Sequence, residues 1–151
     1  MSDLTFSIFI NAEPEVVFPY VGDLLRHREW ATNPMQFEAL SPGPVQAGSH
    51  YRSVARFMGR VITAELAITE YQPPQRFAFT VSDQTGHYEH QFSLKPQEGG
   101  TLVERRVLAE DSLAKRIIGI IIFPLFVIPE SKKALQLLKT KAEQASQALP
   151  R

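Results

Sequence analysis

The sequence predicts a single α+β domain over residues 1–151, in which a long C-terminal helix packs on a curved antiparallel sheet. Two observations predict this class. Between about Phe37 and Ala109, apolar residues recur at every second position and turn residues separate the runs, as in strands joined by hairpins. From Pro129 onward, apolar residues recur at three- or four-residue spacing, as on one face of a helix.

The N-terminal part predicts one strand followed by two short helices. The run LTFSIFI from Leu4 to Ile10 is rich in β-forming residues and ends at the turn-like NAEPE. Pro14 then opens PEVVFPYVGDLLRHREW, in which apolar residues recur at helical spacing. Pro19 and the pair Gly22-Asp23 predict a break between two helices, the second of which starts at Asp23.

The middle of the chain predicts the remaining strands of a sheet of about six or seven. Turn residues cluster at SPGPVQAG, MGR, YQPPQ, DQTG and QEGG. Four of the intervening strands have a clear apolar side, since alternate residues of a strand share a face. In chain order, these sides are formed by Tyr51, Ser53, Ala55 and Phe57; by Ile62, Ala64, Leu66 and Ile68; by Phe77, Phe79 and Val81; and by Tyr88, His90, Phe92 and Leu94.

The last predicted strand, TLVERRVLA, is compatible with two registers. In one, Val103 and Val107 face the core and Arg105 faces inward with them. In the other, the leucines at 102 and 108 face inward together with Glu104 and Arg106. The first register would require an acidic partner or an anionic ligand group, because a buried guanidinium needs a counter-charge.

The long C-terminal helix needs a partner for its apolar stripe, which contains Leu135, Leu138, Ala142, Ala145 and Leu149. The antiparallel sheet is the available partner. A strongly curved sheet that grips one helix can leave a hollow between the two layers. The predicted architecture therefore suits the binding of a small molecule.

Four segments, taken in order, resemble the START-like superfamily, also called SRPBCC, START/Bet v 1-like or helix-grip proteins, and especially its bacterial polyketide cyclase/dehydrase branch. They are INAEPEVVFPYVGD with Trp30, SPGPVQAGSHYR, ITEYQPPQRFAF and EGGTLVERRV. The resemblance covers nearly the whole chain and implies a cavity for an apolar or aromatic ligand between sheet and helix. It implies no single activity, because this fold serves carriers, cyclases, hydrolases, hormone sensors and co-chaperones.

On this basis we expect a protein that binds or transports a small hydrophobic, lipid-like or polyketide-like ligand, in preference to an enzyme. The candidate ligand-binding residues are Trp30, Tyr51, Phe57, Leu66, Phe79, Tyr88, His90, Phe92 and Ile121. One alternative is a polyketide cyclase or aromatase in which Tyr51, His90 and Arg105 move protons. Another is a co-chaperone-like module that binds a protein partner. No catalytic residue is assigned.

Composition and motifs exclude several other classes. The chain contains no Cys, so disulfides and thiolate metal sites are excluded. His87 and His90 lie three apart on a predicted strand and therefore point to opposite faces, which argues against a metal site. Sixteen basic and sixteen acidic residues give no net charge to attract nucleic acid. Nucleotide-binding and common hydrolase motifs are absent, so we expect no cofactor. The N-terminus lacks signal-peptide features, and we expect a cytoplasmic location.

The segment IIGIIIFPLFVI, from Ile117 to Ile128, carries no charged or hydrogen-bonding side chain. It is too short to cross a bilayer, and Gly119 and Pro124 interrupt it. The first interpretation is a broken helix that packs on the sheet or closes one end of the hollow. The second is a dimer contact or a lid, which leaves the protein a monomer or a homodimer. The third and least favoured is docking on a membrane surface.

Overall fold

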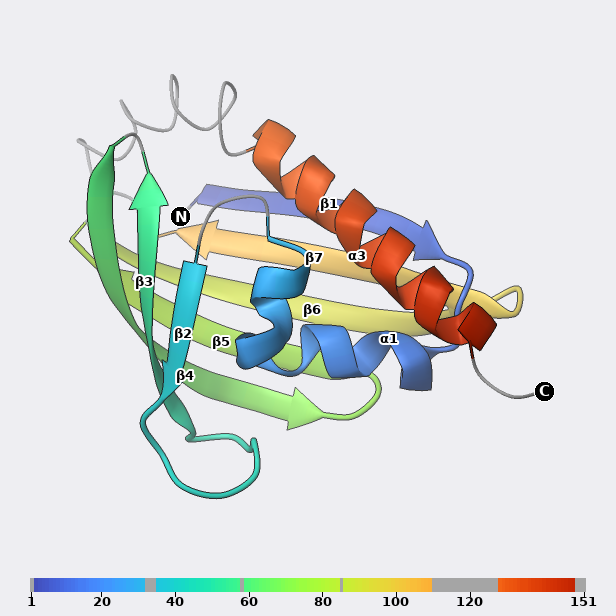
Figure 1. Cartoon of the computed structure of the whole chain (residues 1–151), viewed down its shortest axis with the longest axis horizontal. Helices are drawn as coiled ribbons and strands as arrows, with labels where there is room; N and C mark the ends of the chain where they lie inside the picture. The colour runs from blue at the N-terminus through green and yellow to red at the C-terminus, as the bar shows by residue number, and fades with distance from the viewer. Residues whose placement is uncertain (1, 32–34, 58, 85, 110–127, 149–151) are drawn as a thin grey trace.

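The computed structural model describes residues 2–31, 35–57, 59–84, 86–109 and 128–148. Its centre is a seven-stranded antiparallel sheet with the strand order β1-β7-β6-β5-β4-β3-β2. The sheet curves strongly, and a long helix lies across its concave side (Figure 1). The strands are β1 (Ser2–Ile10), β2 (Met35–Ala39), β3 (His50–Phe57), β4 (Arg60–Gln72), β5 (Arg76–Asp83), β6 (Gly86–Gln97) and β7 (Gly100–Ala109).

Two short helices follow the first strand, as the sequence predicts. Helix α1 (Pro14–Val21) is capped at its C-terminal end by Gly22, and the 3-10 helix η1 (Leu24–Glu29) follows it. The Asp23 carboxylate accepts a hydrogen bond from the backbone N–H of Leu25 at 3.0 Å, which caps η1. An added Cβ at Gly22 would lie 2.5 Å from a ring carbon of Phe18, so the junction requires glycine.

The long helix α3 (Ile128–Ala148) contacts β1 and α1. Its predicted apolar stripe is confirmed within the described residues: Leu135, Leu138 and Ala142 are buried and Ala145 is half-buried. Leu149 lies outside the described residues. This stripe completes a core to which the inner faces of the strands also contribute.

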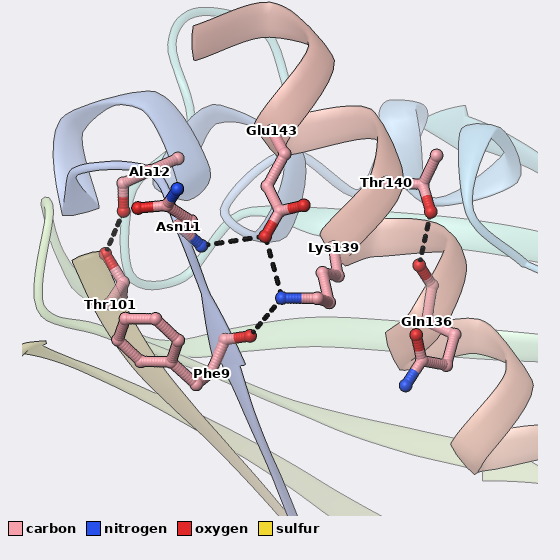
Figure 2. A network of polar contacts seen from close by, with 8 residues as sticks. All are labelled: Phe9, Asn11, Ala12, Thr101, Gln136, Lys139, Thr140 and Glu143. Carbon is pink, nitrogen blue, oxygen red and sulfur yellow. Dashed lines mark hydrogen bonds and ion pairs between the residues drawn. The ribbon is translucent and has the colours of Figure 1, made fainter. Parts of the chain in front are cut away.

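Polar contacts fix α3 against the end of β1 (Figure 2). The Lys139 ammonium group donates to the Phe9 carbonyl oxygen at 2.8 Å and to the Glu143 carboxylate at 2.7 Å. The same carboxylate oxygen accepts from the backbone N–H of Asn11 at 2.9 Å. These bonds use backbone groups just where β1 ends, and they set the position of the helix along the strand.

The structure confirms the predicted strands and selects one of the two registers for the last. In β7, Val103 and Val107 are buried and Arg105 shares their face, whereas Glu104 and Arg106 are exposed on the opposite face. Most of the apolar segment from Ile117 to Ile128 lies outside the described residues, except that Ile128 begins α3. Its three interpretations remain predictions. None of the described helices combines the length and apolar character that a membrane crossing requires.

Candidate functional site

Burial changes along the inner face of the sheet. Phe77 on β5 and Phe92 on β6 are almost completely buried. Further along the same faces, Val81 on β5 and Tyr88 on β6 lie directly opposite each other and are only half-buried. His90 and Arg105 are half-buried on the same side of the sheet. We call the residues Val81, Tyr88, His90 and Arg105 the inner patch.

Arg105 places a positive charge on this inner face. It lies opposite Phe6 on β1 and Phe92 on β6, and its guanidinium carbon is 5.4 Å from the centre of the Phe92 ring. The Nη2 group donates to Nδ1 of His90 at 3.2 Å. The Nε atom is buried and has no hydrogen-bond partner among the residues that the structure describes. Burial lowers the pKa of Arg105 to about 10, which still leaves the side chain charged at neutral pH.

His90 is held as a neutral imidazole beside this charge. Its ring stacks on that of Phe79, with 4.9 Å between the ring centres and 4° between the planes. Burial, the positive charge of Arg105 and the neighbouring His27 all lower the pKa of His90 well below its ordinary value. Because a guanidinium can only donate, Nδ1 is the acceptor and the ring proton resides on Nε2.

His27 is a second neutral histidine in the interior, and the sequence analysis did not single it out. It lies in η1, and its Nε2–H donates to the Val21 carbonyl oxygen at 2.7 Å. Its ring lies 6.0 Å from that of Phe79 and 4.6 Å from that of Trp30. The pKa of His27 is lowered to about 4, mainly by burial. The hydrogen bond to Val21 raises the pKa, and the positive charge of Arg105 lowers it further. The three-residue spacing of Leu24 and His27, both buried, is the sequence signal that could have identified it.

Six of the predicted ligand-binding residues lie on the inner face of the sheet. Four of them are buried within the packed core, namely Tyr51, Leu66, Phe79 and Phe92, and two belong to the inner patch, namely Tyr88 and His90. Burial, followed by the charge of Asp23 and the neighbouring Tyr71, raises the pKa of Tyr51.

The other three predicted ligand-binding residues lie elsewhere. Trp30 follows η1, is buried at 3 % exposure, and donates from Nε1 to the Tyr20 carbonyl oxygen at 3.1 Å. Its ring meets that of Phe92 edge to face at 6.1 Å. The side chain of Phe57 and the whole of Ile121 lie outside the described part of the chain. For all nine residues, a role in ligand binding stays a prediction.

Among the described residues of the inner patch, Arg105 is the cation and His90 is a neutral imidazole. Within the described ranges, no group of three or more His, Cys, Asp or Glu side chains is arranged to hold a metal ion. The histidine at 87 pairs with Ser82 through Nδ1 at 2.7 Å and is half-buried. The arrangement on the inner face suits the binding of an apolar molecule with a polar or anionic group.

A curved antiparallel sheet that grips a C-terminal helix, with two short helices after the first strand, defines a helix-grip protein. The family model described as "Polyketide cyclase / dehydrase and lipid transport" matches residues 1–143. The chain therefore belongs to this family, which confirms the resemblance noted from the sequence. A comparison with curated proteins gave no match.

Solved structures of similar fold come from several sources. Protein CV1439 from Chromobacterium violaceum superposes with a TM-score of 0.72 at 15% identity, covering 95% of this chain and 99% of its own. TTHA0849 from Thermus thermophilus gives a TM-score of 0.66 at 20% identity, with 97% and 98% coverage. Ara h 8.0201 gives a TM-score of 0.67 at 12% identity, with 95% and 98% coverage. At these identities the likeness establishes the helix-grip fold.

Proposed function

We propose that this protein binds a small hydrophobic molecule on the inner face of its sheet and carries it without chemical change. The observation that carries the proposal is the inner patch, where core-like packing gives way to half-buried side chains on the concave side. The family description, which includes lipid transport, supports the same class of ligand. The cytoplasmic location expected from the sequence is part of this proposal.

Burial of apolar surface provides the driving force for such binding. The patch adjoins a wall of aromatic rings that includes Phe79 and Phe92. Removing apolar surface from water contributes roughly 25 cal/mol per Å², so a ligand that loses a few hundred Å² gains several kcal/mol. The neutral histidines add hydrogen-bonding groups without the desolvation cost of further charges.

The test is to fill the patch with a larger side chain. Val81→Trp adds bulk at the half-buried inner position, and Val61→Trp adds the same bulk on the outer face, where Val61 is 55 % exposed. Binding of the apolar dye Nile red is measured by fluorescence in both variants and in the unchanged protein, with thermal melts to verify folding. We expect Val81→Trp to weaken dye binding at least about tenfold, equivalent to about 1.4 kcal/mol, and Val61→Trp to leave it unchanged.

Two outcomes would count against the proposal. The unchanged protein could fail to bind the dye although its melt shows a folded state. Alternatively, both tryptophan variants could bind the dye as well as the unchanged protein, which would place the dye elsewhere. Either result removes the inner patch as the binding surface.

A second candidate function is a polyketide cyclase, favoured by the contact between Arg105 and His90. Two ionisable groups that converge on an inner face can orient a substrate and move protons. The lowered pKa of His90 makes it a weak base at neutral pH, which favours binding over proton transfer. If the protein is a cyclase, His90→Gln abolishes turnover of a polyketone substrate while the substrate still binds. If it is a carrier, no turnover is found and the change acts on stability and binding alone.

A further inference from the structure

Two adjacent arginines on β7 face opposite sides of the sheet and differ in their partners. On the outer face, Arg106 donates from both Nε and Nη2 to one oxygen of the Asp3 carboxylate, with Nε at 2.9 Å. On the inner face, Arg105 has no carboxylate partner among the described residues; its Nη2 meets a neutral histidine and its Nε meets nothing. In Arg106, a carboxylate neutralises the side of the guanidinium formed by Nε and Nη2. In Arg105, no carboxylate of the described residues lies on that side.

The surroundings of Arg105 make this missing counter-charge costly. The side chain lies between Phe6 and Phe92, and its Nε is inaccessible to water. A cation that is partly removed from water without a counter-ion is destabilising, and a buried N–H without an acceptor adds to the loss. The only side-chain acceptor that the described residues offer it is Nδ1 of His90, which carries no negative charge. An anionic oxygen from a ligand beside the guanidinium would supply the missing counter-charge.

We propose that the ligand of this protein is an apolar molecule bearing one carboxylate, and that the guanidinium group of Arg105 binds this carboxylate. This inference rests on the proposed binding function and specifies its ligand class. A guanidinium matches a carboxylate in shape and charge, and the Arg106–Asp3 pair exhibits the same pairing on the outer face. The apolar part of the ligand lies against Val81 and Tyr88, which extend the patch away from the charge. His90 positions the guanidinium through the bond to Nη2.

The experiment compares acids with alcohols of the same shape on the full chain. Dodecanoate is paired with dodecanol, and 2-naphthoate with 2-naphthalenemethanol, so that both an alkyl and an aromatic shape are covered. Displacement of Nile red at pH 7.5 gives the affinity of each compound for the unchanged protein, for Arg105→Met and for Arg106→Met. The last variant is the matched control, because its arginine belongs to the same strand but to the outer face.

We expect the unchanged protein and Arg106→Met to bind at least one acid about tenfold or more tighter than its alcohol, the gain typical of a charge-assisted hydrogen bond. Arg105→Met should lose this preference while the affinity for the alcohol changes less than about threefold. Should Arg105→Met fail to fold, Arg105→Lys serves instead: it keeps the charge but not the planar fork and should reduce the preference. The comparison of acids with alcohols in the unchanged protein tests the preference for a carboxylate even if neither variant folds.

The outcomes separate this inference from the proposed function. If acids and alcohols displace the dye equally well, the binding function stands and the carboxylate inference is wrong. The inference is also wrong if the preference for acids persists in Arg105→Met. If neither member of either pair displaces the dye, or if no dye binds, the proposed function fails and the inference fails with it.

Discussion

The buried histidine His27 leads to a prediction about acid stability. The residue is 7 % exposed, and burial lowers its pKa in the folded protein from an ordinary 6.5 to about 4. The unfolded chain therefore takes up a proton on this residue at a pH where the folded protein does not. Since protons then favour the unfolded state, the free energy of unfolding must fall as the pH is lowered from 6.5 to 4.

The size of this loss follows from the two pKa values. Above pH 6.5 the residue is neutral in both states and contributes no pH dependence. Between pH 6.5 and 4, each pH unit lowers the free energy of unfolding by about 1.4 kcal/mol through this residue. The full interval corresponds to about 3 kcal/mol, of which about 2 kcal/mol is already lost at pH 5.

Urea unfolding between pH 7.5 and 4.5, followed by circular dichroism, measures the effect. The variant His27→Gln keeps an N–H donor for the Val21 carbonyl oxygen but does not titrate. We expect it to be less stable at pH 7.5, because it loses ring contacts, and to show a shallower decline with acid. The remaining slope belongs to His90, whose pKa is also lowered, and to groups shared by both proteins. The control is His50→Gln, which alters an exposed histidine. Parallel pH profiles for the unchanged protein and His27→Gln would refute the reasoning.

Three further predictions concern stability, each measured by urea unfolding at pH 7.5. Thr101→Val removes a buried hydroxyl that donates to the Ala12 carbonyl oxygen at 2.7 Å, and should cost about 1–3 kcal/mol; a loss under 0.5 kcal/mol would contradict this. Gly22→Ala forces a methyl group against the Phe18 ring and should cost about 1–3 kcal/mol, so an unchanged or raised stability would be contrary evidence. Glu143→Gln weakens the partly exposed contacts of Glu143 with Lys139 and with the backbone N–H of Asn11, and should lower the free energy of unfolding by less than about 1 kcal/mol. This loss should become smaller as the salt concentration rises, and a larger loss that does not depend on salt would contradict the prediction.

The elements of the fold were predictable because their apolar periods are visible within single segments. Ala64, Leu66 and Ile68 alternate with exposed or half-buried residues along β4, and all three are buried. On α3, Leu135 and Leu138 recur at helical spacing and are likewise buried. Local periodicity is enough here, because each of these segments has only one apolar face to bury.

The inward register of β7 was not predictable, because both faces of this strand contain apolar residues. Leu102 and Leu108 are half-buried on the outer face, while Val103 and Val107 are buried on the inner face. The choice depends on pairing with β1 and β6, which places Arg105 beside Phe6 and Phe92. Such long-range pairing leaves no trace in the sequence of the strand itself.

The burial of His27 among the aromatic rings was not predicted, for a related reason. Its segment, LLRHREW, is rich in charge and looks like a solvated helix, and Arg26 and Glu29 do form an ion pair on its surface. Burial of the histidine results from the way η1 packs its other face toward the rings of β5 and β6. A three-dimensional arrangement, not the local sequence, determines which side of this short helix enters the core.

The most direct test of the account is to locate a bound ligand on the protein by NMR. Intermolecular nuclear Overhauser effects are recorded between unlabelled 2-naphthoate and the isotope-labelled protein, under conditions where dye displacement shows that the compound is bound. The account predicts contacts from the naphthalene protons to the side chains of Val81 and Tyr88, and a shift of the Arg105 Nε–H resonance that 2-naphthalenemethanol does not reproduce. Contacts confined to exposed apolar side chains such as Val54 or Leu137 would contradict it.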